Sequence, residues 1–156
     1  MPDMLVKLYE LPEWQQHEKD LLKKGIKIRR AIPPEKAKVL EWIEANFQKA
    51  WRSEADVAFS KSPLNIFIAY QDDQILGFAC YDTTAKGFFG PTGVSEKARG
   101  KGIGTVLLLR SLAALKESGY AYAVIGGAGP VEYYKKVCKA VVIEDSEDSI
   151  YQDMFV

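Results

Sequence analysis

The hydrophobic and polar positions of this chain change period repeatedly, from the alternation typical of strands to the three-to-four-residue spacing typical of helices. Alternation or short apolar runs predict strands over residues 5–11, 26–32, 65–70, 75–82, 88–94, 121–125, 141–144 and 150–155. Helical spacing predicts helices over residues 12–24, 35–47, 51–59 and 130–137, and a longer one between Gly104 and Gly119. The chain contains no internal repeat and no low-complexity tract.

Breaker residues support several of these boundaries. Gly25 ends the first helix, and Pro33 and Pro34 precede the second. The Asp72-Asp73 pair indicates a hairpin between two strands. The inner face of the second helix is predicted to contain Val39, Leu40, Ile43 and Phe47.

A glycine-rich turn joins the strand at 88–94 to the long helix. It reads Arg99-Gly100-Lys101-Gly102-Ile103-Gly104. Residues without a Cβ let backbone N–H groups approach an anion closely, and the free donors and dipole of a helix N-terminus favour a phosphate there. The two basic side chains can add charge-assisted hydrogen bonds. The turn therefore predicts a pyrophosphate site, and the alternative is a merely flexible, solvated turn.

The glycine spacing distinguishes this turn from two common phosphate-binding loops. The chain has no Gly-x-x-x-x-Gly-Lys-Ser/Thr string, and its glycines are separated by single residues rather than as in Gly-x-Gly-x-x-Gly. The spacing that fits is Arg-x-x-Gly-x-Gly. In this motif the chain resembles the GNAT superfamily of acyl-CoA-dependent N-acyltransferases, and residues 90–109, GPTGVSEKARGKGIGTVLLL, are similar to its signature throughout.

The resemblance implies an α+β fold with a mixed, mostly antiparallel central sheet flanked by helices and a splayed, cofactor-binding strand pair. It covers about 130 residues from Ile26 onward. It also implies acetyl-CoA as the co-substrate. The implied cofactor-binding residues are Thr92, Gly93, Val94, Arg99, Gly100, Lys101, Gly102, Ile103, Gly104 and Thr105.

A second candidate feature follows the strand at 121–125. Residues 126–130, GGAGP, open a short helix with Pro130 expected in its first turn position. Residues 133–138, YYKKVC, are similar to the family pattern Phe-Tyr-x-x-x-Gly, which places Tyr134 at the family's general-acid tyrosine. This residue would protonate the departing thiolate of coenzyme A. The alternative is that Tyr134 packs against the sheet, as Tyr133 is expected to do.

The resemblance further implies that an amine attacks the thioester directly, with the Val94 N–H stabilising the developing oxyanion. The chain departs from the family pattern in two places. Many members have an asparagine near the start of the short helix, where this chain has Ala128-Gly129-Pro130. Cys138 replaces the usual glycine, so the following loop is expected to differ in shape.

Composition restricts the class of protein. The 156 residues predict a single domain, 1–156, in which residues 1–25 are an N-terminal extension that forms either a hairpin-like cap on the core or part of a dimer contact.

Equal numbers of basic and acidic residues, 21 each, argue against nucleic acid as a partner. No apolar run is long enough to cross a membrane, so a cytoplasmic location is expected. Cys80 and Cys138 are expected to be reduced structural thiols, with no metal site, and His17 to lie on the surface.

The acceptor amine must be neutral when it attacks. Deprotonation at pH 7 costs roughly 4.6 kcal/mol for a lysine-like amine and about 1.0 to 1.4 kcal/mol for an α-amine. The strand at 88–94 contains no residue that could act as a base. Asp82, on the preceding strand, could remove the proton of the amine through a water molecule, or it could be a solvated turn residue with no catalytic role. This reasoning favours a low-pKa amine of a small molecule.

The acceptor side has one further candidate segment. Glu144-Asp145-Ser146-Glu147-Asp148 is expected to join the last two strands and either attract a cationic amine or form a solvated acidic turn. Short similarities to a bacterial GNAT subgroup that includes glucosaminide acetyltransferases favour an amino sugar. Acetylation of protein N-termini or lysines and a non-catalytic acyl-CoA-binding regulator remain alternatives, and edge strands near the C-terminus leave a homodimer open.

Overall fold

The fold is built on one seven-stranded sheet that divides the helices into two groups. The computed structural model describes residues 1–156. The strands follow the order β2-β3-β4-β5-β6-β1-β7, and every neighbouring pair is antiparallel except β5 and β6. Their bounds are β1 Met4–Lys7, β2 Lys27–Arg30, β3 Ile66–Gln71, β4 Gln74–Tyr81, β5 Phe88–Val94, β6 Tyr122–Ile125 and β7 Val141–Val142. This confirms the expected mixed, mostly antiparallel sheet.

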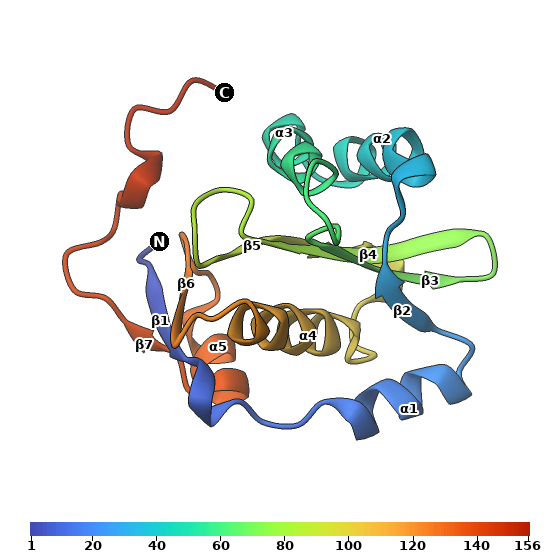
Figure 1. The fold of residues 1–156 in the computed structure, drawn as a ribbon, viewed down its shortest axis with the longest axis horizontal. Helices are drawn as coiled ribbons and strands as arrows, with labels where there is room; N and C mark the ends of the chain where they lie inside the picture. Colours follow the sequence, from blue (N-terminus) through green and yellow to red (C-terminus); the bar gives the residue numbers. More distant parts are fainter.

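Five helices cover the two faces of the sheet. Figure 1 shows α2 and α3 together on one face and α1, α4 and α5 on the other. Their bounds are α1 Gln15–Lys23, α2 Lys36–Asn46, α3 Lys49–Ala58, α4 Ile103–Glu117 and α5 Val131–Cys138. The buried apolar side chains accordingly form one cluster on each face. None of the helices combines the length and the apolar character that crossing a membrane requires.

Local patterns in the sequence account well for α1, α2 and α4. Gly25 and Gly119 follow α1 and α4 with φ of +83° and +103°, the left-handed backbone that ends helices. Val39, Leu40 and Ile43 of α2 are buried as predicted, and Phe47 is half-buried against the same cluster. His17 lies exposed on α1, as expected.

The strands β5 and β6 separate shortly after they meet. Their parallel pairing is confined to Phe88 with Val124 and Phe89 with Ile125. Beyond this point β5 continues along β4 to Val94, which lies opposite Gly77. An opening therefore forms between the C-terminal part of β5 and the end of β6, which confirms the expected splayed pair.

The N-terminal segment lies inside the sheet rather than capping it. The strand β1 pairs with β6 on one side and β7 on the other, with Met4 opposite both Ile125 and Val142. Met4, Val6 and Leu8 are fully buried. The strand also ends sooner than predicted, because Leu8–Glu10 form a 3-10 turn. The expected hairpin-like cap is therefore wrong: β1 fills an interior position of the sheet.

The C-terminal segment contradicts the predicted final pair of strands. The strand β7 has only two residues, and residues 150–155, predicted as a strand, contain the end of a 3-10 turn, Ser149–Tyr151, followed by irregular chain. Asp145, Ser149 and Asp153 have positive φ of 57°, 51° and 58°, which interrupts extended pairing. The acidic segment therefore leads into a turn rather than joining two strands.

Candidate active site

The glycine-rich turn before α4 has the backbone that its sequence predicts. Gly100 and Gly102 have φ of +82° and +89°, and a Cβ at either position would meet no atom within 4 Å. Glycine is therefore needed here for conformation, and the space beside it is open. Gly102 is the N-cap of α4 and provides no side-chain cap, so the first N–H groups of the helix are free to bind an anion.

A cavity of about 460 Å³ lies against this turn. Its walls include every residue that was predicted to bind the cofactor except Lys101, which is exposed to solvent. Arg99 also donates from Nε to the Val94 carbonyl, at 3.3 Å. The cavity combines free backbone donors with open space and an apolar wall, so it fits a pyrophosphate with a longer organic arm. Its lining consists of Phe89, Thr92, Gly93, Val94, Ala98, Arg99, Gly100, Gly102, Ile103, Gly104, Thr105, Leu108, Pro130, Tyr133 and Tyr134.

The Val94 N–H points toward the opening between β5 and β6. Successive N–H groups of a strand point to opposite sides, and Ser95 donates to the Leu76 carbonyl on the β4 side at 2.8 Å. Val94 precedes Ser95 and forms a non-hydrogen-bonded pair with Gly77. Its N–H is therefore a backbone donor directed away from β4, at the place where the strands have separated.

The two neighbouring tyrosines of α5 have different surroundings. The Tyr133 hydroxyl lies 2.8 Å from the Thr105 hydroxyl and ties α5 to the first turn of α4. The Tyr134 side chain is only 7% exposed, and its hydroxyl hydrogen-bonds to no other protein group. Burial, with smaller contributions from Tyr133 and Cys138, raises the pKa of Tyr134 to about 12. Tyr134 therefore keeps its proton at neutral pH and has it available for donation.

The start and end of α5 correct two details of the sequence analysis. Pro130 is the N-cap, with φ −85° and ψ 132°, and Val131 is the first helical residue. At the other end Cys138 is buried, and its thiol donates to the Tyr134 carbonyl at 3.3 Å. The left-handed residue that ends the helix is Lys139, with φ +55°. Cys138 thus continues the helix, and the turn falls one residue later.

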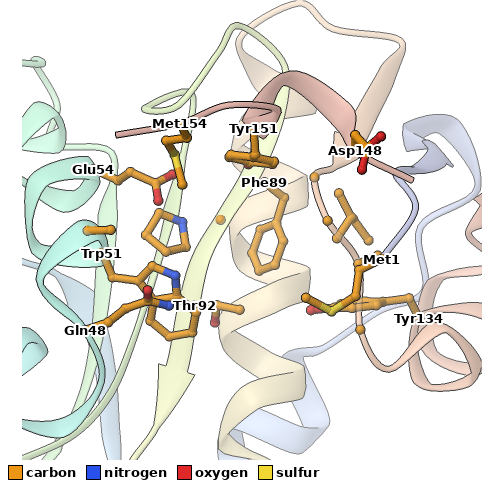
Figure 2. A pocket seen from close by; sticks show the side chains of 18 of the residues that line it. Met1, Gln48, Trp51, Glu54, Phe89, Thr92, Tyr134, Asp148, Tyr151 and Met154 are labelled. Atoms are coloured by element: carbon orange, nitrogen blue, oxygen red, sulfur yellow. The ribbon is translucent and has the colours of Figure 1, made fainter. Parts of the chain in front are cut away.

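A second cavity, of about 390 Å³, opens on the other side of Tyr134. Figure 2 shows side chains converging on it from α3, β5, α5, the N-terminus and the C-terminal segment. Phe89, Thr92 and Tyr134 line both cavities. The remaining lining consists of Met1, Gln48, Ala50, Trp51, Glu54, Gly90, Pro91, Ile125, Gly126, Gly127, Ala128, Gly129, Glu147, Asp148, Tyr151 and Met154.

The side chains around the second cavity include three carboxylates and no lysine, arginine or histidine, and one of the three, Glu147, is paired with the Met1 amino group at 3.1 Å. Glu54, on α3, is half-buried and accepts a hydrogen bond from the Thr84 hydroxyl. Glu147 and Asp148 belong to the acidic segment, and both are exposed. Burial, followed by the charge of Glu54, raises the pKa of Tyr151 to about 12. Glu54 was not predicted as a site residue, because its only signal in the sequence is its place three positions after Trp51 on a predicted helix.

Asp82 does not belong to either cavity, so the hypothesis of a base at this position is wrong. Its carboxylate accepts hydrogen bonds from the Gly87 N–H at 2.6 Å and from the Tyr120 hydroxyl at 3.0 Å. Asp82 itself has φ +58°. These contacts identify it as a turn residue that closes the connection between β4 and β5.

Asp3 connects the N-terminal strand to the wall of the second cavity. Its side chain is largely buried and accepts hydrogen bonds from the Gly127 N–H at 2.9 Å and the Ser149 hydroxyl at 2.7 Å. Its backbone N–H donates to the Ser146 hydroxyl at 2.9 Å. Asp3 therefore fixes the C-terminal segment against the loop before α5, a role that no local sequence signal revealed.

The sequence of the chain matches one known protein family. Residues 36–138 match the sequence model described as the acetyltransferase (GNAT) family. No curated protein sequence matches the chain significantly.

Three solved structures illustrate the similarity of fold. A GCN5-related glucosamine N-acetyltransferase region of a fungal multi-domain GH3 β-N-acetylglucosaminidase is 18% identical with a TM-score of 0.74, covering 91% of this chain and 19% of that one. A GCN5-related N-acetyltransferase from Sphaerobacter thermophilus is 23% identical with a TM-score of 0.68, covering 91% and 48%. A GNAT family acetyltransferase from Brucella melitensis, in complex with acetyl-CoA, is 22% identical with a TM-score of 0.58, covering 78% and 90%. The chain thus spans only part of the first two proteins.

Proposed function

Because the chain belongs to the GNAT acetyltransferase family, we propose that it transfers the acetyl group of acetyl-CoA to a primary amine of a small molecule. The observation that carries this proposal is the pair of cavities that share Phe89, Thr92 and Tyr134. The glycine-rich turn supports pyrophosphate binding in one cavity, and the second cavity has a size suited to a small acceptor. The shared residues are where the two substrates would meet.

Within the first cavity, the backbone would hold the cofactor. The free N–H groups around Gly102 and the start of α4 would bind the pyrophosphate, and the side chain of Arg99 lies next to them. Bound acetyl-CoA supplies the acetyl group as an activated thioester. The Val94 N–H, directed into the opening between β5 and β6, would donate to the carbonyl oxygen as negative charge develops on it.

Proton transfer to the leaving sulfur would come from Tyr134. Its hydroxyl is protonated at neutral pH, since its ordinary pKa of 10.0 already lies well above 7 and burial raises that pKa further, to about 12, and it has no competing hydrogen-bond partner in the protein. Tyr133 is not a candidate for this role, since its hydroxyl is paired with that of Thr105. The neutral amine would attack the thioester carbonyl directly from the second cavity, without an acyl-enzyme intermediate, and the proton that its nitrogen loses as the amide forms would restore the Tyr134 hydroxyl.

The acceptor is proposed to be a small cationic amine, with an amino sugar as the first compound to test. The second cavity, of about 390 Å³, is bordered by Glu54 and Asp148, which have no cationic partner, and by Glu147, which pairs with the Met1 amino group. This negative wall attracts amines, which are cationic in water. The similar fungal region is described as a glucosamine N-acetyltransferase, which supports including glucosamine.

The test is thiol release from acetyl-CoA by the purified protein in the presence of glucosamine, other small amines or peptides. The proposal predicts release that depends on a small amine, with the acetylated amine identified by mass spectrometry. Turnover with peptides alone would replace the small-molecule acceptor with a protein acceptor. Tight binding of acetyl-CoA without turnover on any amine would contradict catalysis altogether.

A further inference from the structure

Glu54 is a partly buried acid that has no cationic partner. Its carboxylate accepts a hydrogen bond from the Thr84 hydroxyl, and it takes part in none of the ion pairs of the structure. The charged neighbours on the same helix are engaged elsewhere, since Arg52 pairs with Glu44, and Asp56 with Lys36. Carboxylates removed from water are normally paired, so the uncompensated charge of Glu54 favours a cation in the second cavity.

Among the three carboxylates that border the second cavity, Glu54 is the most shielded from water. Glu147 and Asp148 are exposed, whereas Glu54 is half-buried between α3 and the loop after β4. Its charge reaches buried groups, because it contributes to raising the pKa of both the Cys80 thiol and the Tyr151 hydroxyl. A charge shielded in this way attracts a bound cation more strongly than an exposed one does.

An aromatic surface lies next to this carboxylate. Trp51 precedes Glu54 by three residues on α3, so the two side chains leave the helix on the same side, and both line the second cavity. The Trp51 ring packs against Phe47 and Phe78, with centroids 5.2 Å and 6.2 Å apart, which holds it in place. An indole face beside a carboxylate is a favourable environment for an ammonium group.

The position of Glu54 separates it from the reacting atoms. Figure 2 shows Glu54 and Tyr134 on opposite sides of the cavity, with Phe89 between them. An amine beside Tyr134 can receive the acetyl group, whereas an ammonium held by Glu54 stays protonated, because a neighbouring carboxylate stabilises its charge. One amine cannot satisfy both requirements, so the two sides of the cavity suit two different groups of one molecule.

We propose that the acceptor is a small diamine, whose one amine is acetylated near Tyr134 while its second, as ammonium, is held by Glu54 and Trp51. This inference rests on the proposed acetyl transfer and narrows the acceptor from small amines in general to diamines, which places a diamine ahead of the monoamine glucosamine. A monoamine of the same length leaves Glu54 uncompensated.

The experiment compares a short linear diamine with the monoamine in which a methyl group replaces the second ammonium. It uses wild type, Glu54→Gln and the control Asp56→Asn, which changes an acid on the same helix that pairs with Lys36. Glutamine keeps the shape of Glu54 and an oxygen that accepts from Thr84. Circular dichroism and thermal unfolding establish that each variant is folded. Calorimetry measures diamine binding to the protein independently of turnover.

Wild type is expected to have a kcat/KM for the diamine at least about tenfold above that for the monoamine. Glu54→Gln should remove about ten- to a hundredfold of kcat/KM for the diamine, chiefly through KM, and weaken its calorimetric affinity similarly. The loss with the monoamine should be clearly smaller, so that the preference for the diamine over the monoamine disappears. Asp56→Asn should change neither. Equal losses with both amines, or an unchanged diamine KM, would overturn the role of Glu54 while acetyl transfer still stood. Failure of wild type to acetylate any amine would overturn the proposed function, and this inference with it.

Discussion

The hydroxyl groups of Tyr133 and Thr105 lie 2.8 Å apart, joining α5 to the first turn of α4 beside the glycine-rich turn. The ring of Tyr134 packs edge-on against Tyr133, with centroids 5.2 Å apart, yet its own hydroxyl has no partner in the protein. Two adjacent residues of identical type are thus separated by their surroundings into a structural tyrosine and a candidate proton donor.

Removal of the hydrogen bond between Tyr133 and Thr105 should affect stability rather than chemistry. Tyr133→Phe is expected to lower the free energy of unfolding by about 1 kcal/mol. The double variant with Thr105→Val should lose little more than the larger single loss, because both changes remove the same interaction. Urea denaturation of the four proteins provides this cycle. Fully additive losses would show that the two hydroxyls do not stabilise each other.

Two glycine substitutions should fail for different physical reasons. Gly102→Ala meets open space but forces alanine to φ +89°, so we expect a loss of about 1 to 2 kcal/mol together with a raised KM for acetyl-CoA. In Gly93→Ala the new methyl group would lie 2.5 Å from the Phe47 ring, which packs against Trp51 and Phe78. That crowding should cost about 1 to 3 kcal/mol. Denaturant midpoints measure the stability of both variants, and acetyl-CoA kinetics measure the KM. If Gly93→Ala were as stable as wild type, the packing of Phe47 against Gly93 would be contradicted.

Asp3 should control the order of the C-terminal segment. Asp3→Ala removes the acceptor for the Gly127 N–H and the Ser149 hydroxyl, and we expect about 1 to 3 kcal/mol less stability. Limited proteolysis should cleave the region after residue 142 faster in this variant. Glu144→Ala, an exposed acid near the same segment, serves as the control. Equal cleavage rates in the two variants would remove the role assigned to Asp3.

The buried Tyr134 and the half-buried Tyr151 should make the protein sensitive to alkali. Burial raises the pKa of Tyr134 and Tyr151 from 10.0 to about 12 in the folded state. A raised folded pKa means that the stabilisation is complete below pH 10 and is lost as pH rises from about 10 to about 12. The free energy of unfolding should therefore fall over that interval, and less steeply in Tyr134→Phe/Tyr151→Phe. Urea midpoints at about pH 9 and about pH 11 measure this loss of stability in wild type and in the double variant. If both proteins lost the same stability between the two pH values, the burial of these hydroxyls would be contradicted.

The parts of the fold and the site that the sequence predicts are those set by neighbouring residues. The bounds of β5 match the structure, and the positive φ of Gly100 and Gly102 is a local property of the glycine-rich turn. The similarity of the short helix to the family pattern pointed to Tyr134, which lines both cavities and whose role as proton donor stays a prediction, and the N-cap of this helix lies one residue from the expected place. In each case the signal lies within a few consecutive residues.

The parts that were missed depend on pairing between distant residues. Met4 pairs with Ile125, and the side chain of Asp3 binds Ser149, so neither the interior place of β1 nor the anchoring of the C-terminal segment has a local signature. Glu54 looks like any exposed helical acid until the rotation of α3 and the contact with Thr84 are known. Asp82 was considered as a base acting through water because β5 contains no base and Asp82 lies next to the preceding strand, but its carboxylate is used by turn contacts.

The most direct test of the account is the effect of Tyr134→Phe on acetyl transfer, measured together with acetyl-CoA binding. With the amine that wild type acetylates best, kcat should fall by about a hundredfold or more, while the calorimetric affinity for acetyl-CoA stays within about twofold. Tyr133→Phe, the matched control, should retain most of its kcat. An unchanged kcat in Tyr134→Phe, or an equal loss in Tyr133→Phe, would contradict the assignment of Tyr134 as the proton donor between the two cavities.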